Sequence, residues 1–384
     1  MKRVRLLICL FAIASLLITP VTASASLPIG YATTLYIDSA KIGEADSFLI
    51  SKNGQYMMVD TGKAKYTKDQ ATGVVTYDNQ LDWPEVKGML ATRGVTRLKA
   101  LVITHYDIDH VGNFLNLIKY FKDNNYTIDH IYARKYTSDQ LFTLTEERRN
   151  NYIMFINGLL TYLNRSSETF DLSKYKDTFT LDDAKTVAIK ANDLFGAGNG
   201  LWIFPTRTNP NANFTLDGNT TVKWLNKWDS YVVPGMDPNG IDDAINNDSL
   251  TFKLNFDSTQ TGNAQSMLFT GDISWTPQSD LVTNCNSDII NTGILKVPHH
   301  GIGSYQNKTF INAVSPAYSF ATTATSYQRI DDMKTHGKFG NIYYSNIASS
   351  DTDFCTIAIR IKAPSLVFDD TALTFYGVDS KDDK

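Results

Sequence analysis

Histidine and aspartate residues gather at three points of this 384-residue chain, and their types and spacing suit metal-ion chemistry. The chain has only six histidines, and four of them fall in the runs His105-Tyr106-Asp107-Ile108-Asp109-His110 and His299-His300. Asp272 lies between these two runs, directly after a glycine. Imidazole nitrogens and carboxylate oxygens bind divalent metal ions in proteins. Because a short apolar run precedes each of the three points, we predict one metal site built at strand ends.

The apolar runs are typical of short β-strands. We predict strands at 35–38, 47–50, 56–59, 99–104, 250–256, 266–270, 293–297 and 317–321. Apolar residues recur at helical spacing from Phe114 to Phe121, so a helix is expected after the first His/Asp run. The alternation predicts an α/β fold in which helices cover sheets. We interpret 26–384 as a single domain, with an aromatic-rich insertion around 125–245 made of surface loops and one helical hairpin.

The N-terminus predicts an export signal over residues 1–25. Lys2, Arg3 and Arg5 give a basic start, an apolar run follows from 6 to 18, and Ala23-Ser24-Ala25 offers a small-residue cleavage site. A membrane anchor is the alternative, but the run is short for a bilayer span, which needs about 20 residues. We therefore expect a secreted protein of the extracellular space or cell envelope, with no membrane span after cleavage.

Charge and cysteine content limit the possible functions. Removal of the signal changes the formal net charge from −4 to about −7, because three positive charges and no negative ones are lost. No long basic run remains, which argues against tight, nonspecific nucleic-acid binding but leaves room for a small basic groove. Only Cys285 and Cys355 remain, and the sequence leaves open whether they pair. It also leaves the oligomeric state open.

Four motifs carry a resemblance to the metallo-β-lactamase superfamily. Residues 104–113 resemble its His-x-His-x-Asp-His signature, and Val59-Asp60-Thr61-Gly62 resembles its early Asp-Thr-Gly turn. Residues 269–272 resemble the strand that ends in its metal-bridging aspartate, and 297–301 resemble its late histidine motif. The resemblance spans about 33 to 340.

Within that superfamily the chain is most similar to the hydrolase domain of ComEC-type DNA-uptake proteins. The shared features are the variant His-x-Asp-x-Asp-His, the run at 295–301 and the Asn-x-Ser-Leu element at 247–250. The Asp-Val-Gly-Gln-Gly-Asp-Ala opening of those proteins is matched only loosely by residues 38–47, and their channel helices are absent.

The resemblance implies an αββα sandwich with two divalent metal ions at one edge. The implied ligands are His105 and Asp107 at one ion, Asp109, His110 and His300 at the other, and Asp272 as the bridge. Asp60 would support the site from behind the ligands, unless it is a turn aspartate without that role. His299 is either a ligand or a supporting group.

One departure concerns the identity of the metal. Lactamase-type members hold their first ion with three histidines, but between His110 and Asp272 this chain has only His130, which we interpret as structural. The first site would therefore be richer in oxygen than in nitrogen, which favours Mn²⁺ over Zn²⁺. We expect activity with Mn²⁺ at least equal to that with Zn²⁺.

The implied reaction is hydrolysis. Two divalent ions would lower the pKa of a water molecule held between them and stabilise charge on the attacked group. Asp109 could orient that water, and His336 is the candidate for protonating the leaving group, unless it is a surface-loop histidine.

Three functions remain to be compared. The first is a secreted phosphodiesterase acting on DNA, for example extracellular DNA, on RNA, or on a phosphodiester polymer of the cell envelope. The second is a lactone or β-lactam hydrolase, against which stand the missing third histidine and the 161 residues between His110 and Asp272. The third is a non-catalytic envelope- or carbohydrate-binding protein that uses Trp202, Trp224 and Trp228 as a stacking surface.

Overall fold

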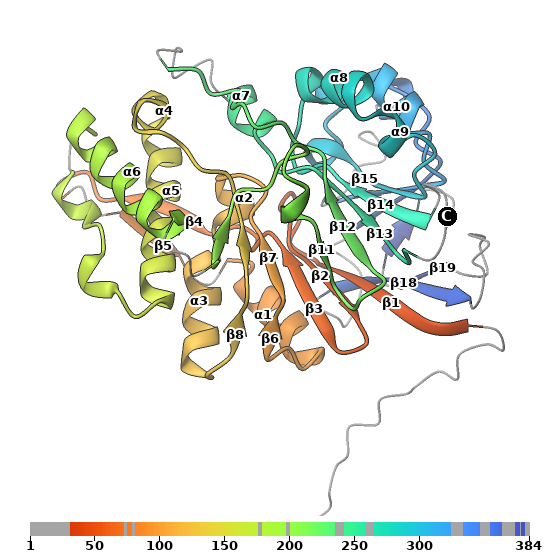
Figure 1. Cartoon of the computed structure of the whole chain (residues 1–384), viewed down its shortest axis with the longest axis horizontal. Coiled ribbons are helices and arrows are strands. Elements are labelled where there is room, and N and C mark those ends of the chain that lie inside the picture. The colour runs from red at the N-terminus through yellow and green to blue at the C-terminus, as the bar shows by residue number, and fades with distance from the viewer. Residues whose placement is uncertain are drawn as a thin grey trace, which may run out of the picture.

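Two large sheets face each other, and helices cover the outer side of each (Figure 1). The structure is a computed structural model that describes residues 31–72, 75–78, 81–175, 179–196, 200–234, 242–258, 265–323, 333–345, 354–362, 373–376 and 378–380. The predicted αββα sandwich is confirmed.

The first sheet has the strand order β10 (Trp202–Ile203), β9 (Ile131–Tyr132), β7 (Ala100–Val102), β3 (Gln55–Val59), β2 (Phe48–Lys52), β1 (Tyr31–Ala40), β18 (Phe354–Lys362) and β19 (Leu373–Tyr376). The second has the order β11 (Phe214–Thr215), β12 (Thr221–Trp224), β13 (Phe252–Asn255), β14 (Ser266–Phe269), β15 (Ile294–Lys296), β16 (Tyr318–Ala321), β17 (Asn341–Ser345) and β20 (Val378–Ser380). Two short ribbons pair β4 (Lys65–Lys68) with β5 (Val75–Asp78) and β6 (Arg97–Leu98) with β8 (Thr127–Ile128).

The helices in the described part of the chain are α1 (Trp83–Thr92), α2 (Ile108–Val111), α3 (Phe114–Asp123), α4 (Ser138–Thr143), α5 (Glu146–Tyr162), α6 (Leu181–Gly196), α7 (Asp242–Asn247), α8 (Trp275–Asn284), α9 (Asn286–Ile289) and α10 (Lys308–Val314). Figure 1 shows α8, α9 and α10 together beside β14 and β15, while α3, α5 and α6 lie on the other side of the molecule. The eight predicted strands and the predicted helix over 114–121 are all present.

Alternating side chains build the three apolar layers. In β2, Phe48 and Ile50 join the core between the sheets, whereas Leu49 joins the core under α1, α3 and α5. In the second sheet, Leu268 and Leu295 face the core under α8, α9 and α10. Full burial of such a side chain contributes about 1.5–3 kcal/mol. A slip of one residue would turn each strand's apolar set to the wrong layer, so the register is strongly fixed.

Parallel pairing sets where the functional loops emerge. β3 pairs in parallel with β7, and β14, β15 and β16 pair in parallel with one another. Parallel neighbours end at the same edge of a sheet, so the loops after β3 and β7 come together, as do those after β14, β15 and β16. These loops hold all the predicted ligands.

The segment around 125–245 contributes to both sheets. It supplies β9 and β10 to the first sheet, β11 and β12 to the second, and α5, which packs against α3. Trp202 and Trp224 are buried in the core, and only Trp228 of the three tryptophans is exposed. A stacking surface made of all three is therefore ruled out.

Two other expectations concern the cysteines and the membrane. Cys285 and Cys355 are both buried and free, and they lie in different apolar layers. Within the described residues no helix has the length and apolarity needed to cross a bilayer. The predicted signal at 1–25 lies outside the described residues.

Candidate metal centre

Four of the predicted ligands converge at the edge where the two sheets meet. Ligand atoms of Asp109 and His110, from α2, and of Asp272 and His300, from the loops after β14 and β15, all lie within 4.8 Å of one another. The Nε2 atoms of His110 and His300 are 3.2 and 3.1 Å from Asp272 Oδ2. Asp272 Oδ2 is therefore close to both rings at once.

A strained turn aims His300 at this point. His299, His300 and Gly301 have φ angles of 47°, 52° and 85°, all in the left-handed region. This conformation costs about 1–2 kcal/mol for each non-glycine residue. At Gly301 a Cβ would lie 2.6 Å from Met333 Sδ, so the third position has no room for a side chain. Such strain is concentrated at functional sites, where surrounding packing maintains it.

Asp60 orients two histidines from behind. Its Oδ2 lies 2.8 Å from His110 Nδ1 and also accepts a hydrogen bond from the Thr104 hydroxyl. Because that hydroxyl gives its proton to Asp60, it accepts from His105 Nδ1, 3.1 Å away. Asp60 itself has a φ of 57°, and its Oδ1 accepts from the Thr104 backbone N–H. Both rings thus carry their proton on Nδ1.

Asp46 orients the third histidine in the same way. The Thr322 hydroxyl donates to Asp46 Oδ1 and therefore accepts from His300 Nδ1, 2.9 Å away. Hydrogen bonds of this kind fix the tautomer and the ring orientation of metal-binding histidines. They direct Nε2 toward the site, where it can bind an ion in place of a proton.

The surroundings of the histidine Nε2 atoms show whether the cluster suits a metal ion. The Nε2 atoms of His105, His110 and His300 are all buried; that of His105 makes no hydrogen bond, and those of His110 and His300 face the Asp272 carboxylate. Leaving a buried polar atom without a partner costs about 1–3 kcal/mol, so native structures rarely do so without a reason. Two carboxylates and two imidazoles around one point are suitable ligands for a divalent ion. The residues therefore fit a divalent metal ion.

The charges in the cluster favour the same conclusion. Burial alone would lower the pKa of His300, but Asp272 and Asp109 beside it raise that pKa to about 9. Burial would likewise raise the pKa of Asp272, yet His300, His110 and Lys296 hold it well below its usual range. Without an ion the carboxylates thus gather protons onto the imidazoles, and a divalent ion would replace those protons.

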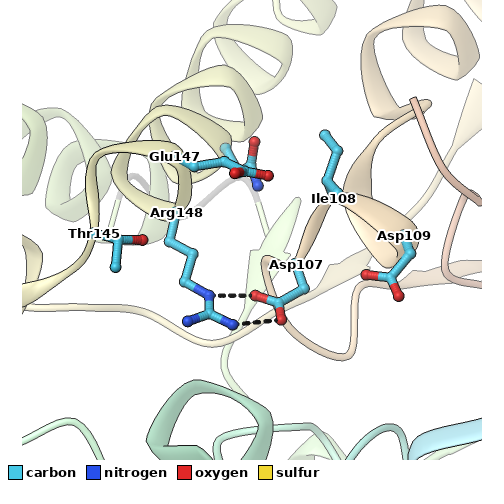
Figure 2. A pocket seen from close by; sticks show the side chains of 7 residues that line it. Asp107, Ile108, Asp109, Thr145, Glu147 and Arg148 are labelled. Atoms are coloured by element: carbon cyan, nitrogen blue, oxygen red, sulfur yellow. Dashed lines mark hydrogen bonds and ion pairs between the residues drawn. The ribbon is translucent and has the colours of Figure 1, made fainter. Parts of the chain in front are cut away.

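Asp107, which the resemblance implies as a ligand of the first ion, is instead bonded to an arginine. Both of its oxygens accept from the Arg148 guanidinium, at 2.7 and 2.8 Å (Figure 2). Its Oδ2 is 3.9 Å from His105 Nε2. Among the described residues, neither Asp107 nor His105 belongs to a group of three ligand atoms close enough to share an ion. The implied first site is therefore less complete than the second.

Sequence reasoning missed three charged residues at the centre. Asp46 and Lys296 are buried and form an ion pair of 2.6 Å, and Lys296 Nζ is also 3.4 Å from Asp272 Oδ1. A lysine at the end of an apolar strand, three residues before His299, was a usable signal for Lys296. Arg148 had no such signal, because it belongs to α5, in the segment that we interpreted as an insertion.

The remaining histidines lie at different distances from the cluster. His299 packs on Tyr305, with ring centroids 4.1 Å apart, and its Nε2 is 3.8 Å from Asp272 Oδ2. His336 Nδ1 lies 3.0 Å from the Thr335 hydroxyl, and His336 is not in either group of residues that could jointly hold an ion. His130 is bonded to the Gly200 carbonyl, as suits a structural residue.

Two facing sheets with a His/Asp cluster at their shared edge define an αββα protein equipped for a divalent ion. Residues 41–154, a little under a third of the chain, match the family model described as "Metallo-beta-lactamase superfamily". This part of the chain is thus similar to the metallo-β-lactamase superfamily.

Comparison with solved structures finds only distant similarity. The metallo-β-lactamase fold protein YhfI from Bacillus subtilis is 12% identical, with a TM-score of 0.42 over 85% of this chain and 99% of that chain. A protein of unknown function from Enterococcus faecalis is 10% identical, with a TM-score of 0.28 over 69% and 49%. Both likenesses are too distant to bear on function. No curated protein matches the chain.

Proposed function

We propose that the protein is a metal-dependent hydrolase of phosphodiesters. The observation that supports metal dependence is the cluster of Asp109, His110, Asp272 and His300, whose ligand atoms all lie within 4.8 Å of one another. A cavity of about 330 Å³ adjoins this cluster and has Asp109 in its wall. A substrate in the cavity would therefore lie within reach of the metal ligands.

The residues of the chain divide the chemical work. A divalent ion held by the cluster supplies a Lewis acid that activates water and offsets charge on the substrate. Asp109 lines the cavity, so its carboxylate can orient a water molecule toward the bond to be broken. The Arg148 guanidinium and the Thr145 hydroxyl also line it and offer donors to phosphate oxygens (Figure 2). His336 remains our candidate for protonating the leaving group.

The choice of a phosphodiester rests on these donors and on the ComEC-type motifs. Extracellular DNA and phosphodiester polymers of the cell envelope are the candidate substrates. A net charge near −7 does not suit a processive nuclease, which needs a cationic track along the strand. We therefore expect slow, salt-sensitive cleavage, one phosphate at a time. Lactone or β-lactam hydrolysis is the second candidate.

One parallel assay separates these substrates. The purified protein is stripped with a chelator, reloaded with Mn²⁺ or Zn²⁺, and given bis-p-nitrophenyl phosphate, labelled single-stranded DNA, nitrocefin and a lactone. We expect phosphodiester cleavage, with Mn²⁺ at least as effective as Zn²⁺, and its loss in Asp272→Ala and His110→Ala. Rapid nitrocefin turnover with intact DNA would show that the substrate is wrong. Activity near wild type in either variant would contradict the site.

We also propose that the protein is exported. The support is the pattern of a basic start, an apolar run and Ala23-Ser24-Ala25. N-terminal sequencing of the protein from culture medium or envelope fractions should begin at Ser26. An intact Met1 on protein found only in the cytoplasm would contradict export.

A further inference from the structure

Arg148 holds the carboxylate that a second metal ion would need. Its Nε and Nη2 donate to the two oxygens of Asp107, so both oxygens already have a charged partner. The pair is mostly buried, since the Arg148 and Asp107 side chains are 13% and 19% exposed. A two-pronged pair of this kind, partly shielded from water, is stronger than an exposed ion pair.

The guanidinium also opposes a second ion by its charge. Arginine stays protonated at any physiological pH, so a positive charge is fixed beside Asp107. A divalent ion bound to Asp107 would lie close to that charge, in a partly buried place where screening is weak.

The other residues near this position cannot compensate. His105 keeps a buried Nε2 without a hydrogen bond and is ready to bind an ion. With Asp107 neutralised, however, the further candidates are Asp272, which already belongs to the Asp109 cluster, and His299, which like His105 is in no group of three ligand atoms close enough to share an ion. Without a set of converging ligands of its own, this position would hold an ion only weakly.

We propose that Arg148 limits this centre to one tightly bound divalent ion, held by Asp109, His110, Asp272 and His300, by keeping Asp107 from a second. This inference rests on the proposed metal dependence but goes beyond it, because it assigns the number of ions and the residue that sets that number. Arg148 acts on the centre through Asp107 and is a positioning residue.

The test counts ions rather than turnover. Full-length protein is stripped with a chelator, loaded with Mn²⁺ and freed of excess metal on a desalting column. Inductively coupled plasma mass spectrometry then gives the metal content per chain. We expect one equivalent in the wild type and two in Arg148→Met, which removes the charge but keeps most of the aliphatic stem. Electron paramagnetic resonance should show isolated Mn²⁺ in the wild type and an exchange-coupled pair in Arg148→Met.

Arg97→Met is the matched control. Arg97 forms the same two-pronged pair with Asp129, but just before β7, whereas the site follows β7. This variant should keep one equivalent.

Each result decides the inference. Two tightly held ions in the wild type, or only one in Arg148→Met, would overturn it and leave the proposed function standing. An uncoupled signal at two equivalents in Arg148→Met would also overturn it, since the second ion would lie elsewhere. A wild type that retains no ion would contradict the proposed metal dependence itself, and this inference with it.

Discussion

At this centre, single side chains determine which ring nitrogen of each histidine carries the proton. Each of the three buried imidazoles has Nδ1 against a carboxylate or a hydroxyl, and the hydroxyls in turn donate to Asp60 or Asp46. These two acids lie behind the ligands, yet they decide which ring nitrogen faces the site. Residues in such positions are expected to tune metal affinity without binding the ion.

The first prediction tests this at Asp60. An asparagine in its place would keep the left-handed φ of 57°, which asparagine tolerates, and its carbonyl oxygen could still accept from the Thr104 N–H. Its amide N–H groups, however, would face His110 Nδ1 and disturb the tautomer. We expect Asp60→Asn to weaken metal binding by about 10–100-fold with the fold retained. Isothermal titration calorimetry and circular dichroism measure the two effects, and an unchanged affinity would contradict the role.

A second prediction concerns Asp82, outside the metal centre. Burial raises its pKa from 3.8 to about 6, although the Lys63 backbone N–H bonded to it acts in the opposite direction. The folded state therefore holds the proton more tightly than the unfolded state. The carboxylate costs nothing below the unfolded value, and it destabilises the fold increasingly as pH rises toward 6.

Replacement of Asp82 by asparagine should remove that cost. Asparagine tolerates its φ of 59° and can accept the same hydrogen bond. We expect Asp82→Asn to stabilise the protein by about 1 kcal/mol at pH 7.5, after allowance for partial exposure, and by nothing below about pH 4. Urea unfolding at both pH values measures this. A gain of equal size at the two pH values would show that the carboxylate charge is not the cause.

The site is assembled from loops at strand ends. A buried lysine connects three of these strand ends through its hydrogen bonds and ion pair. Lys296, the last residue of β15, bonds to Asp46 in the loop after β1 and to the Gly271 carbonyl after β14. Gly271 has a φ of 51°, and a Cβ there would lie 2.7 Å from Ser249 Cβ, so this loop packs tightly against Ser249. The ion pair thus ties the first sheet to the second beside the ligands.

The third prediction removes this connection. Breaking a buried pair by deleting one partner costs about 3–5 kcal/mol. For Lys296→Met we expect about 3 kcal/mol, the low end, because Thr322 still donates to Asp46. The double variant Lys296→Met/Asp46→Asn should lose less than the sum of the two single losses. Urea unfolding in excess chelator gives the free energies of unfolding for this double-mutant cycle. If the two single losses simply added up, Lys296 and Asp46 would not be energetically coupled.

The sequence predicted elements and loop chemistry better than side-chain partners. Periodicity located the strands and α3 because each element's burial pattern is local. The His/Asp runs located the cluster because short loops after parallel strands must meet. Arg148, by contrast, lies 41 residues from Asp107, and its pairing depends on how α5 packs against α3. Likewise β9 to β12 are only two to four residues long, too short for periodicity to detect.

At the scale of the whole molecule, the candidate centre lies on the seam between the two sheets. His110 and Asp109 follow a strand of the first sheet, while Asp272 and His300 follow strands of the second. Without an ion, this seam holds several buried carboxylates and protonated imidazoles whose mutual attraction depends on pH. An ion that binds all four residues would fasten the sheets together.

The last prediction follows from that position. An ion that binds only the folded state adds about 2.7 kcal/mol when its free concentration is 100 times the dissociation constant. One kcal/mol shifts the melting temperature by about 2–4 °C in proteins of 150–250 residues, and by less in longer chains. We therefore expect chelation to lower the melting temperature by about 5 °C, and either Zn²⁺ or Mn²⁺ to restore it. Zn²⁺ should have the larger effect at equal concentration, because it binds mixed nitrogen and oxygen sites more tightly. Differential scanning fluorimetry measures these shifts, with Asp272→Asn as the variant that should not respond. If wild type and Asp272→Asn shifted equally, the stabilising ion would have to bind outside this cluster.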